Sequence, residues 1–100
     1  MDVIALNAAD VDLKRREIRR AEQTLRLTRI EHRLMQWFAR HPGELFSQAE
    51  LLEAVWGYLP GTRSCTVYTT IQRLRRKLEI DPRHPRHLQT VFGVGFRFEP

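Results

Sequence analysis

The sequence contains a single cysteine, Cys65, and it has no apolar run that approaches the length of a membrane-spanning helix. One cysteine excludes an intrachain disulfide and any zinc site built on several cysteines. Residues 1–9 lack the basic start and the long apolar middle of a signal peptide. These absences lead us to expect a cytoplasmic protein with no membrane partner.

The sequence also lacks the residue patterns of enzyme and metal sites. It has no nucleophile–base set, no phosphate-binding glycine loop and no cofactor motif. Its four histidines do not follow a metal-ligand spacing. We therefore expect a binding protein and not an enzyme, with no cofactor and no metal ion.

Acidic residues are fewer than basic ones. There are 12 aspartate and glutamate residues against 17 lysine and arginine residues, which gives a formal net charge of +5. Fifteen of the 17 basic residues are arginine, whose planar guanidinium binds phosphates and guanine edges through paired hydrogen bonds. This balance favours a polyanionic partner, although an arginine bias is also typical of a GC-rich genome.

A chain of 100 residues, 42% of them apolar, predicts one globular domain over residues 1–100. Its first part alternates apolar and polar residues in short segments, which predicts strands at residues 3–6, 11–13, 17–21 and 24–28. Strands this short with tight connections indicate an antiparallel meander with one face on a core.

Two capping boxes follow the predicted strands. Thr28 with Glu31 predicts the start of one helix, which a proline–glycine pair ends. Ser47 with Glu50 predicts the start of a second helix, which ends at Gly57. A loop with turn residues then leads to a basic segment.

Residues 63–79 form that basic segment, and their spacing predicts a third helix. One stripe of it is apolar: Val67, Ile71, Leu74 and Leu78. The opposite face carries Cys65, Thr69, Gln72, Arg73 and Arg76. No acidic residue occurs in the segment before Glu79. Such a helix suits the major groove of DNA, and a solvated basic surface helix is the alternative.

The C-terminal residues predict a β-hairpin. Residues 87–92 and 96–98 have a strand-like pattern, and the glycines between them allow a tight turn. Two capped helices, the second followed by a basic third helix and then a hairpin, form a winged helix-turn-helix arrangement.

Several motifs resemble those of the OmpR/PhoB-type winged-helix DNA-binding domain of bacterial response regulators in two-component systems. The matching motifs are Leu27-Thr28-x-x-Glu31, His41-Pro42-Gly43, Leu51-Leu52-x-x-Val55-Trp56-Gly57, Arg73-Leu74-Arg75-Arg76-Lys77-Leu78 and Gln89-Thr90-Val91-Phe92-Gly93-Val94-Gly95-Phe96-Arg97-Phe98. The resemblance implies an α+β fold, a winged helix-turn-helix with an N-terminal four-stranded antiparallel sheet, a three-helix core and a C-terminal β-hairpin wing.

The resemblance also implies sequence-specific binding of double-stranded DNA in bacterial transcription regulation. Helix 63–79 is then expected in the major groove and wing 88–98 at the adjacent minor groove. Such proteins bind as dimers to paired half-sites, and the loop corresponding to residues 58–62 is where they touch RNA polymerase. A chain of this length cannot also hold a receiver domain, so we expect an effector domain alone.

We predict DNA-contacting residues from the helical wheel and from the resemblance. The candidates for base edges are Thr69, Gln72, Arg73 and Arg76. The candidates for phosphates are Arg63, Thr66, Thr70, Arg75 and Lys77. The wing adds Thr90 and Arg97 as candidates for a phosphate or the minor groove.

Four residues depart from the usual pattern of the family. Cys65 and Phe92 stand where arginine is usual or frequent, Tyr68 where aspartate is usual, and Thr70 where histidine is common. Neutral or apolar groups therefore replace several charged ones. This motivates an alternative function, a winged-helix module for protein–protein interaction with weakened or lost DNA binding.

Overall fold

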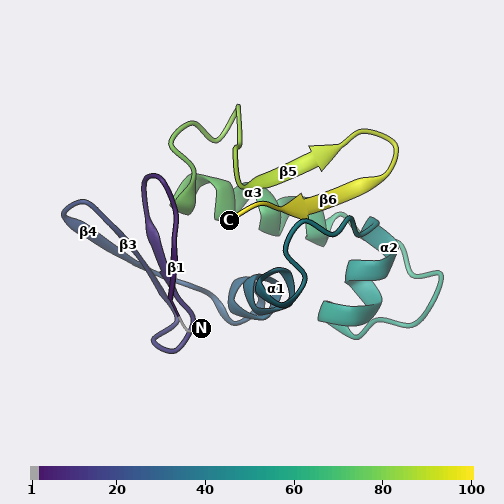
Figure 1. Cartoon of the computed structure of the whole chain (residues 1–100). Coiled ribbons are helices and arrows are strands. Elements are labelled where there is room, and N and C mark those ends of the chain that lie inside the picture. Colours follow the sequence, from purple (N-terminus) through teal and green to yellow (C-terminus); the bar gives the residue numbers. More distant parts are fainter. Residues whose placement is uncertain (1–2) are drawn as a thin grey trace.

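The computed structural model describes residues 3–100, which form a four-stranded sheet, a set of helices and a hairpin (Figure 1). The sheet lies at one end of the molecule and the hairpin lies beside α3. The elements are β1 (Val3–Ala5), β2 (Asp10–Asp12), β3 (Glu17–Arg20), β4 (Gln23–Arg26), α1 (Arg29–Arg40), α2 (Gln48–Leu51), η1 (Leu52–Trp56), α3 (Thr66–Leu78), β5 (Leu88–Val91) and β6 (Gly95–Phe98). The predicted winged helix-turn-helix is confirmed.

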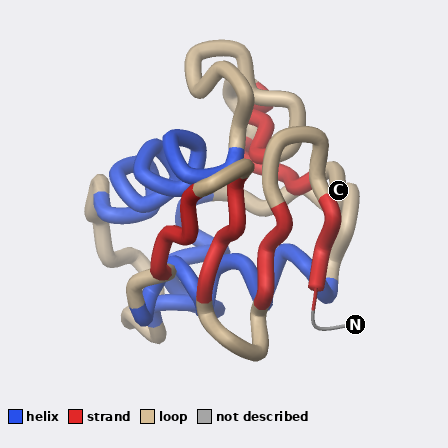
Figure 2. The backbone as a smooth tube through the Cα atoms, turned by 90° about the vertical axis from the view of Figure 1, so that its left-hand side faces the viewer, coloured by secondary structure: helices blue, strands red, loops and turns tan. Residues whose placement is uncertain are grey.

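The N-terminal sheet is an antiparallel meander in the order β1-β2-β3-β4, as predicted (Figure 2). Val11 and Ile18 face each other across β2 and β3, and both are fully buried. Asp12 accepts a hydrogen bond of 2.9 Å from Arg19 Nη1, and this contact lowers the pKa of the Asp12 carboxyl. One face of the sheet therefore lies on the core, while paired charges occur at its margin.

Both predicted capping boxes are confirmed. Thr28 Oγ1 accepts from the Glu31 backbone at 3.2 Å, and Glu31 Oε1 accepts from the Thr28 backbone at 2.8 Å. Ser47 and Glu50 repeat this exchange at 3.1 and 2.9 Å. These contacts satisfy backbone N–H groups that have no partner within the helix. The second helix widens to a π-helix in η1, a detail that the spacing of its apolar residues did not predict.

The core forms where α1, α3 and the hairpin meet. The predicted apolar stripe of α3 is confirmed, because Val67, Ile71, Leu74 and Leu78 are all fully buried. Burial of each such side chain contributes roughly 1.5–3 kcal/mol. The third helix begins at Thr66, with Cys65 as its N-cap residue, so the predicted start at Arg63 is wrong. Within residues 3–100, no helix has the length and apolar character needed to cross a membrane.

The C-terminal hairpin, called the wing below (Leu88–Phe98), is attached to the body by its second strand. The backbones of Phe46 and Phe96 exchange two hydrogen bonds of 2.9 Å. Gly95 lies so close to this bridge that an added Cβ would stand 2.0 Å from the Phe46 carbonyl oxygen. The second strand of the wing is therefore fixed to the body close to the turn, and the turn lies just beyond this attachment.

This close approach predicts the effect of a methyl group at Gly95. Gly95→Ala is expected to lower the free energy of unfolding by about 1–3 kcal/mol, because the backbone must move to accommodate it. Urea denaturation measures the change. Gly93→Ala in the same hairpin is the control, since its Cβ would meet no atom within 4 Å and only its positive φ of 76° adds strain. Equal losses for the two variants would contradict a steric role for Gly95.

Candidate nucleic-acid interface

The outer face of α3 presents most of the predicted base-reading residues to solvent. Thr69, Arg73 and Arg76 are exposed, and Gln72 is half-buried. They lie opposite the buried stripe, so core packing fixes the direction in which they point. This face is polar and basic, and none of these four side chains is part of the hydrophobic core.

A groove of about 700 Å³ runs between α3 and the wing. It is lined by Tyr68, Gln72, Arg75, Arg76, Pro82, Arg83, Pro85, Gln89, Thr90 and Phe92. Within the described chain, none of these lining residues is acidic. The groove therefore has a positive potential that favours an anion such as a phosphodiester backbone. Arg83 was missed by the sequence reasoning, because a charged proline-rich loop does not reveal which way its side chains point.

Arg75 lines the buried side of the groove. It is 5% exposed, its Nε donates to the Leu88 carbonyl at 2.9 Å, and its Nη2 donates to Thr90 Oγ1 at 2.7 Å. Burial lowers the pKa of its guanidinium, although arginine stays protonated. Two of its N–H groups therefore hold β5 against α3, a structural role that the sequence did not predict.

Thr70 and Lys77 also make contacts within the protein that the sequence did not predict. Thr70 is 3% exposed and its hydroxyl donates to the Thr66 carbonyl at 2.8 Å. Lys77 Nζ lies 2.6 Å from the buried Glu31 carboxylate and 2.8 Å from the Arg26 carbonyl. The Thr70 hydroxyl is therefore used within α3, whereas Lys77 joins α3 to α1 and to the end of β4.

Glu79, which directly follows α3, fixes the start of the wing. Its buried carboxylate accepts hydrogen bonds from the backbones of Arg86 at 2.9 Å, His87 at 3.0 Å and Leu88 at 2.8 Å. Arg20 from β3 donates to two carbonyls near the end of α3, those of Arg76 and Lys77. Sequence reasoning missed both roles, because each depends on contacts between distant parts of the chain.

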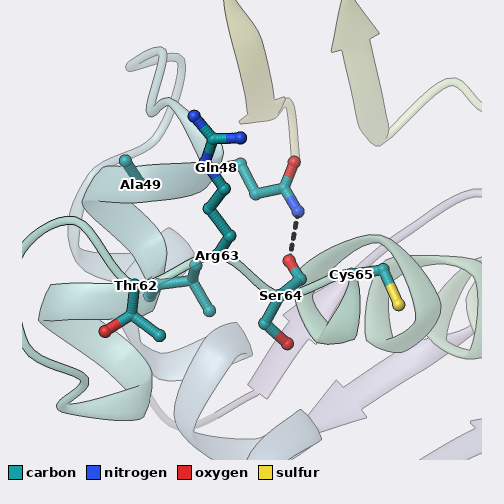
Figure 3. A pocket seen from close by; sticks show the side chains of 7 residues that line it. Gln48, Ala49, Thr62, Arg63, Ser64 and Cys65 are labelled. Atoms are coloured by element: carbon teal, nitrogen blue, oxygen red, sulfur yellow. Dashed lines mark hydrogen bonds between the residues drawn. The ribbon is translucent and has the colours of Figure 1, made fainter.

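The N-terminal end of α3 borders a second hollow, of about 590 Å³ (Figure 3). Gln48 Nε2 donates to the Ser64 carbonyl at 2.6 Å and so ties α2 to the segment before α3. The Gln48 amide points toward Ser64, the Arg63 guanidinium extends away from Ser64, and the Cys65 thiol lies apart from both. Arg63 is exposed and Thr66 is half-buried. Both predicted phosphate candidates therefore stand at the start of α3.

The two wing residues predicted to contact DNA, Thr90 and Arg97, lie in different environments. Thr90 is exposed at the groove while its hydroxyl accepts from Arg75. Arg97 instead donates to Gln89 Oε1 at 2.8 Å and lies 3.8 Å from Glu99. Arg97 thus belongs to the base of the wing, where its partners partly neutralise it. Among the described residues, no group of three or more His, Cys, Asp or Glu is placed to hold a metal ion.

Comparison with known proteins identifies close relatives of this arrangement. Residues 22–98 match the family model described as "Transcriptional regulatory protein, C terminal". The transcriptional regulatory protein KdpE of Mycobacterium tuberculosis is 38% identical over 97 residues, which are 97% of this chain and 43% of that relative. The chain therefore spans less than half the length of this curated relative.

Two solved structures share the fold over almost the whole chain. The DNA-binding domain of CpxR from Escherichia coli is 29% identical with a TM-score of 0.73, and the match covers 99% of this chain and 97% of that one. The RstA DNA-binding domain of Klebsiella pneumoniae, crystallised with the RstA box, has a TM-score of 0.79 at 23% identity. That match covers 100% of this chain and 99% of the RstA chain.

The different burial of two arginines on α3 predicts different effects on stability. Arg75→Ala should lower the free energy of unfolding by about 1–3 kcal/mol, because the Leu88 carbonyl loses its buried donor. Arg73→Ala should change it by no more than about 0.5 kcal/mol, since Arg73 is exposed. Urea denaturation of both variants measures the difference. A stability of Arg75→Ala equal to that of the wild type would contradict its structural role.

Proposed function

The chain belongs to the family of C-terminal domains of transcriptional regulatory proteins, and on this basis we propose that it binds double-stranded DNA sequence-specifically to regulate transcription. The observation that carries the proposal is the basic groove between α3 and the wing, next to the exposed face of α3. A helix and a hairpin placed this way match the dimensions and charge of two adjacent DNA grooves.

The geometry suggests how the duplex lies. With α3 in the major groove and the wing at the minor groove, the DNA strand that separates these grooves passes through the 700 Å³ groove. Its phosphates then meet donors from both walls, Gln72 and Arg76 on α3 and Arg83 and Thr90 on the other side. Contacts of this kind fix register and orientation without reading the sequence.

Bases are contacted by the residues on the face of α3 opposite its buried stripe. Arg73 can grip the O6 and N7 atoms of guanine with two hydrogen bonds, and the Thr69 methyl can rest on a thymine methyl. Gln72 and Arg76 border the groove, so they reach either a base edge or the phosphate next to it. Arg63 and Thr66 contact phosphates at the start of the helix. Arg97 has at most a minor role, given its contacts with Gln89 and Glu99.

We also propose a protein contact for the loop 58–62. Loop 58–62 exposes Tyr58 and Leu59, the latter 79% exposed, which suits a protein contact such as RNA polymerase. We also propose binding as a dimer to paired half-sites, acting in the cytoplasm as the effector domain of a two-component response regulator.

The alternative function, a protein-interaction module, has one specific observation in its favour. Cys65, Tyr68 and Phe92 are all exposed and uncharged, although they border the proposed DNA surface. If this alternative holds, duplex DNA is bound weakly or not at all at low salt, and a protein partner is bound at micromolar concentration.

Selection of bound duplexes from a random DNA pool, followed by sequencing, tests the proposal. It should enrich a repeated half-site. On the enriched duplex, Arg73→Ala should reduce the preference at one base pair by about 1–3 kcal/mol, while Arg76→Ala should weaken all duplexes and lower the salt dependence. Competition titrations against single-base variants of the duplex measure both effects.

Arg33→Ala is the matched control for these variants. It removes one positive charge from an exposed position on α1 and should leave the base preference unchanged. Failure to enrich any sequence would contradict sequence-specific binding. An equal loss on every duplex for Arg73→Ala would contradict the role of Arg73 but not DNA binding itself.

A further inference from the structure

The tip of the wing is apolar and exposed, although a DNA contact is proposed beside it. Phe92 is 94% exposed and Val94 is 52% exposed. Between Leu88 and Phe96 the wing contains no charged residue. The nearest cation on the hairpin, Arg97, is held at the base by Gln89 and Glu99. The tip therefore has no charged side chain with which to bind a phosphate.

The backbone holds Phe92 at the outermost corner of the hairpin. The Val94 N–H donates to the Val91 carbonyl at 3.0 Å, and Gly93 has a positive φ of 76°, the features of a tight turn with Phe92 at its first corner. The bridge between Phe46 and Phe96 fixes the hairpin only one strand pair away from this turn. Phe92 is thus presented on a rigid support and is not packed by the core.

Phe92 also lines the proposed backbone groove, and the proposed function places the wing that carries it at the minor groove. Tyr68 of α3 lines the same groove. We propose that Phe92 is an apolar wedge that enters the minor groove and partly unstacks one base step. This inference rests on the proposed function. Apolar side chains that unstack a step bend the duplex toward the major groove, so that more of the protein surface can reach it.

The proposal makes the wing sensitive to DNA deformability. An unstacked step costs less where the stack is weak, so pyrimidine–purine steps at this position are expected to bind best. Such a preference arises without a hydrogen bond to any base edge. It therefore adds specificity at a position outside the reach of α3.

The test measures affinity, salt dependence and stacking on a duplex taken from the random-pool selection. Phe92→Ala should lower affinity by roughly tenfold, about the effect of losing one aromatic stack on a base, and leave the slope of log affinity against log salt unchanged. Phe92→Arg should steepen that slope by about one. A 2-aminopurine at the wing-side step should brighten when the wild type binds and stay quenched with Phe92→Ala.

Ile80→Ala is the matched control, because Ile80 is also apolar and 64% exposed but lies beyond the end of α3. It should leave affinity and fluorescence unchanged. Because Phe92 is exposed, its variants should unfold at the wild-type temperature, so a loss of binding cannot come from unfolding.

The outcomes separate the two proposals. If the wild type binds its selected duplex and Phe92→Ala does so equally well, with no change in fluorescence, the wedge is refuted and the proposed function stands. If the wild type enriches and binds no duplex, both fail. If the free chain forms a dimer in sedimentation that Phe92→Ala abolishes, Phe92 contacts a second copy, and the wedge is refuted.

Discussion

The arrangement of the interface depends on two buried side chains, Arg75 of α3 and Glu79, which directly follows α3. Both form hydrogen bonds with the backbone of Leu88 in the wing. Arg75 donates to the Leu88 carbonyl at 2.9 Å, and Glu79 accepts from the Leu88 N–H at 2.8 Å. Arg75 and Glu79 are four residues apart, so they lie on the same side of the helix. Together they form hydrogen bonds with both the backbone C=O and the backbone N–H of Leu88 in β5. A neighbouring β-strand would satisfy the same two groups.

This pairing explains why so few of the basic residues of α3 remain available for a ligand. Buried charges are tolerated only when their hydrogen bonds are satisfied, and Arg75 and Glu79 meet this condition through the wing and through each other's charge. Lys77 is also engaged, because its Nζ lies 2.6 Å from the Glu31 carboxylate. Arg73 and Arg76 are the basic residues of α3 that remain exposed.

The division between rigid and exposed parts suits a surface that must fit a duplex of fixed dimensions. The bridge from Phe46 to Phe96 and the contacts of Glu79 set the distance between α3 and the wing. Side chains placed on such a support bind without first becoming ordered, which reduces the entropic cost of association. The proposed contacts of Phe92 and Arg73 both start from side chains on this rigid support.

The sequence alone determined the elements and the order in which they occur. Two capping boxes and the stripe from Val67 to Leu78 are local patterns, and local hydrogen bonds and helical periodicity produce them. Only the tertiary structure decided what each polar side chain does. Thr70, Arg75 and Lys77 looked like surface donors on a helical wheel, but their partners are the Thr66 carbonyl, the wing and Glu31. A wheel gives the direction of a side chain, whereas its burial depends on segments far away in the chain that pack over it.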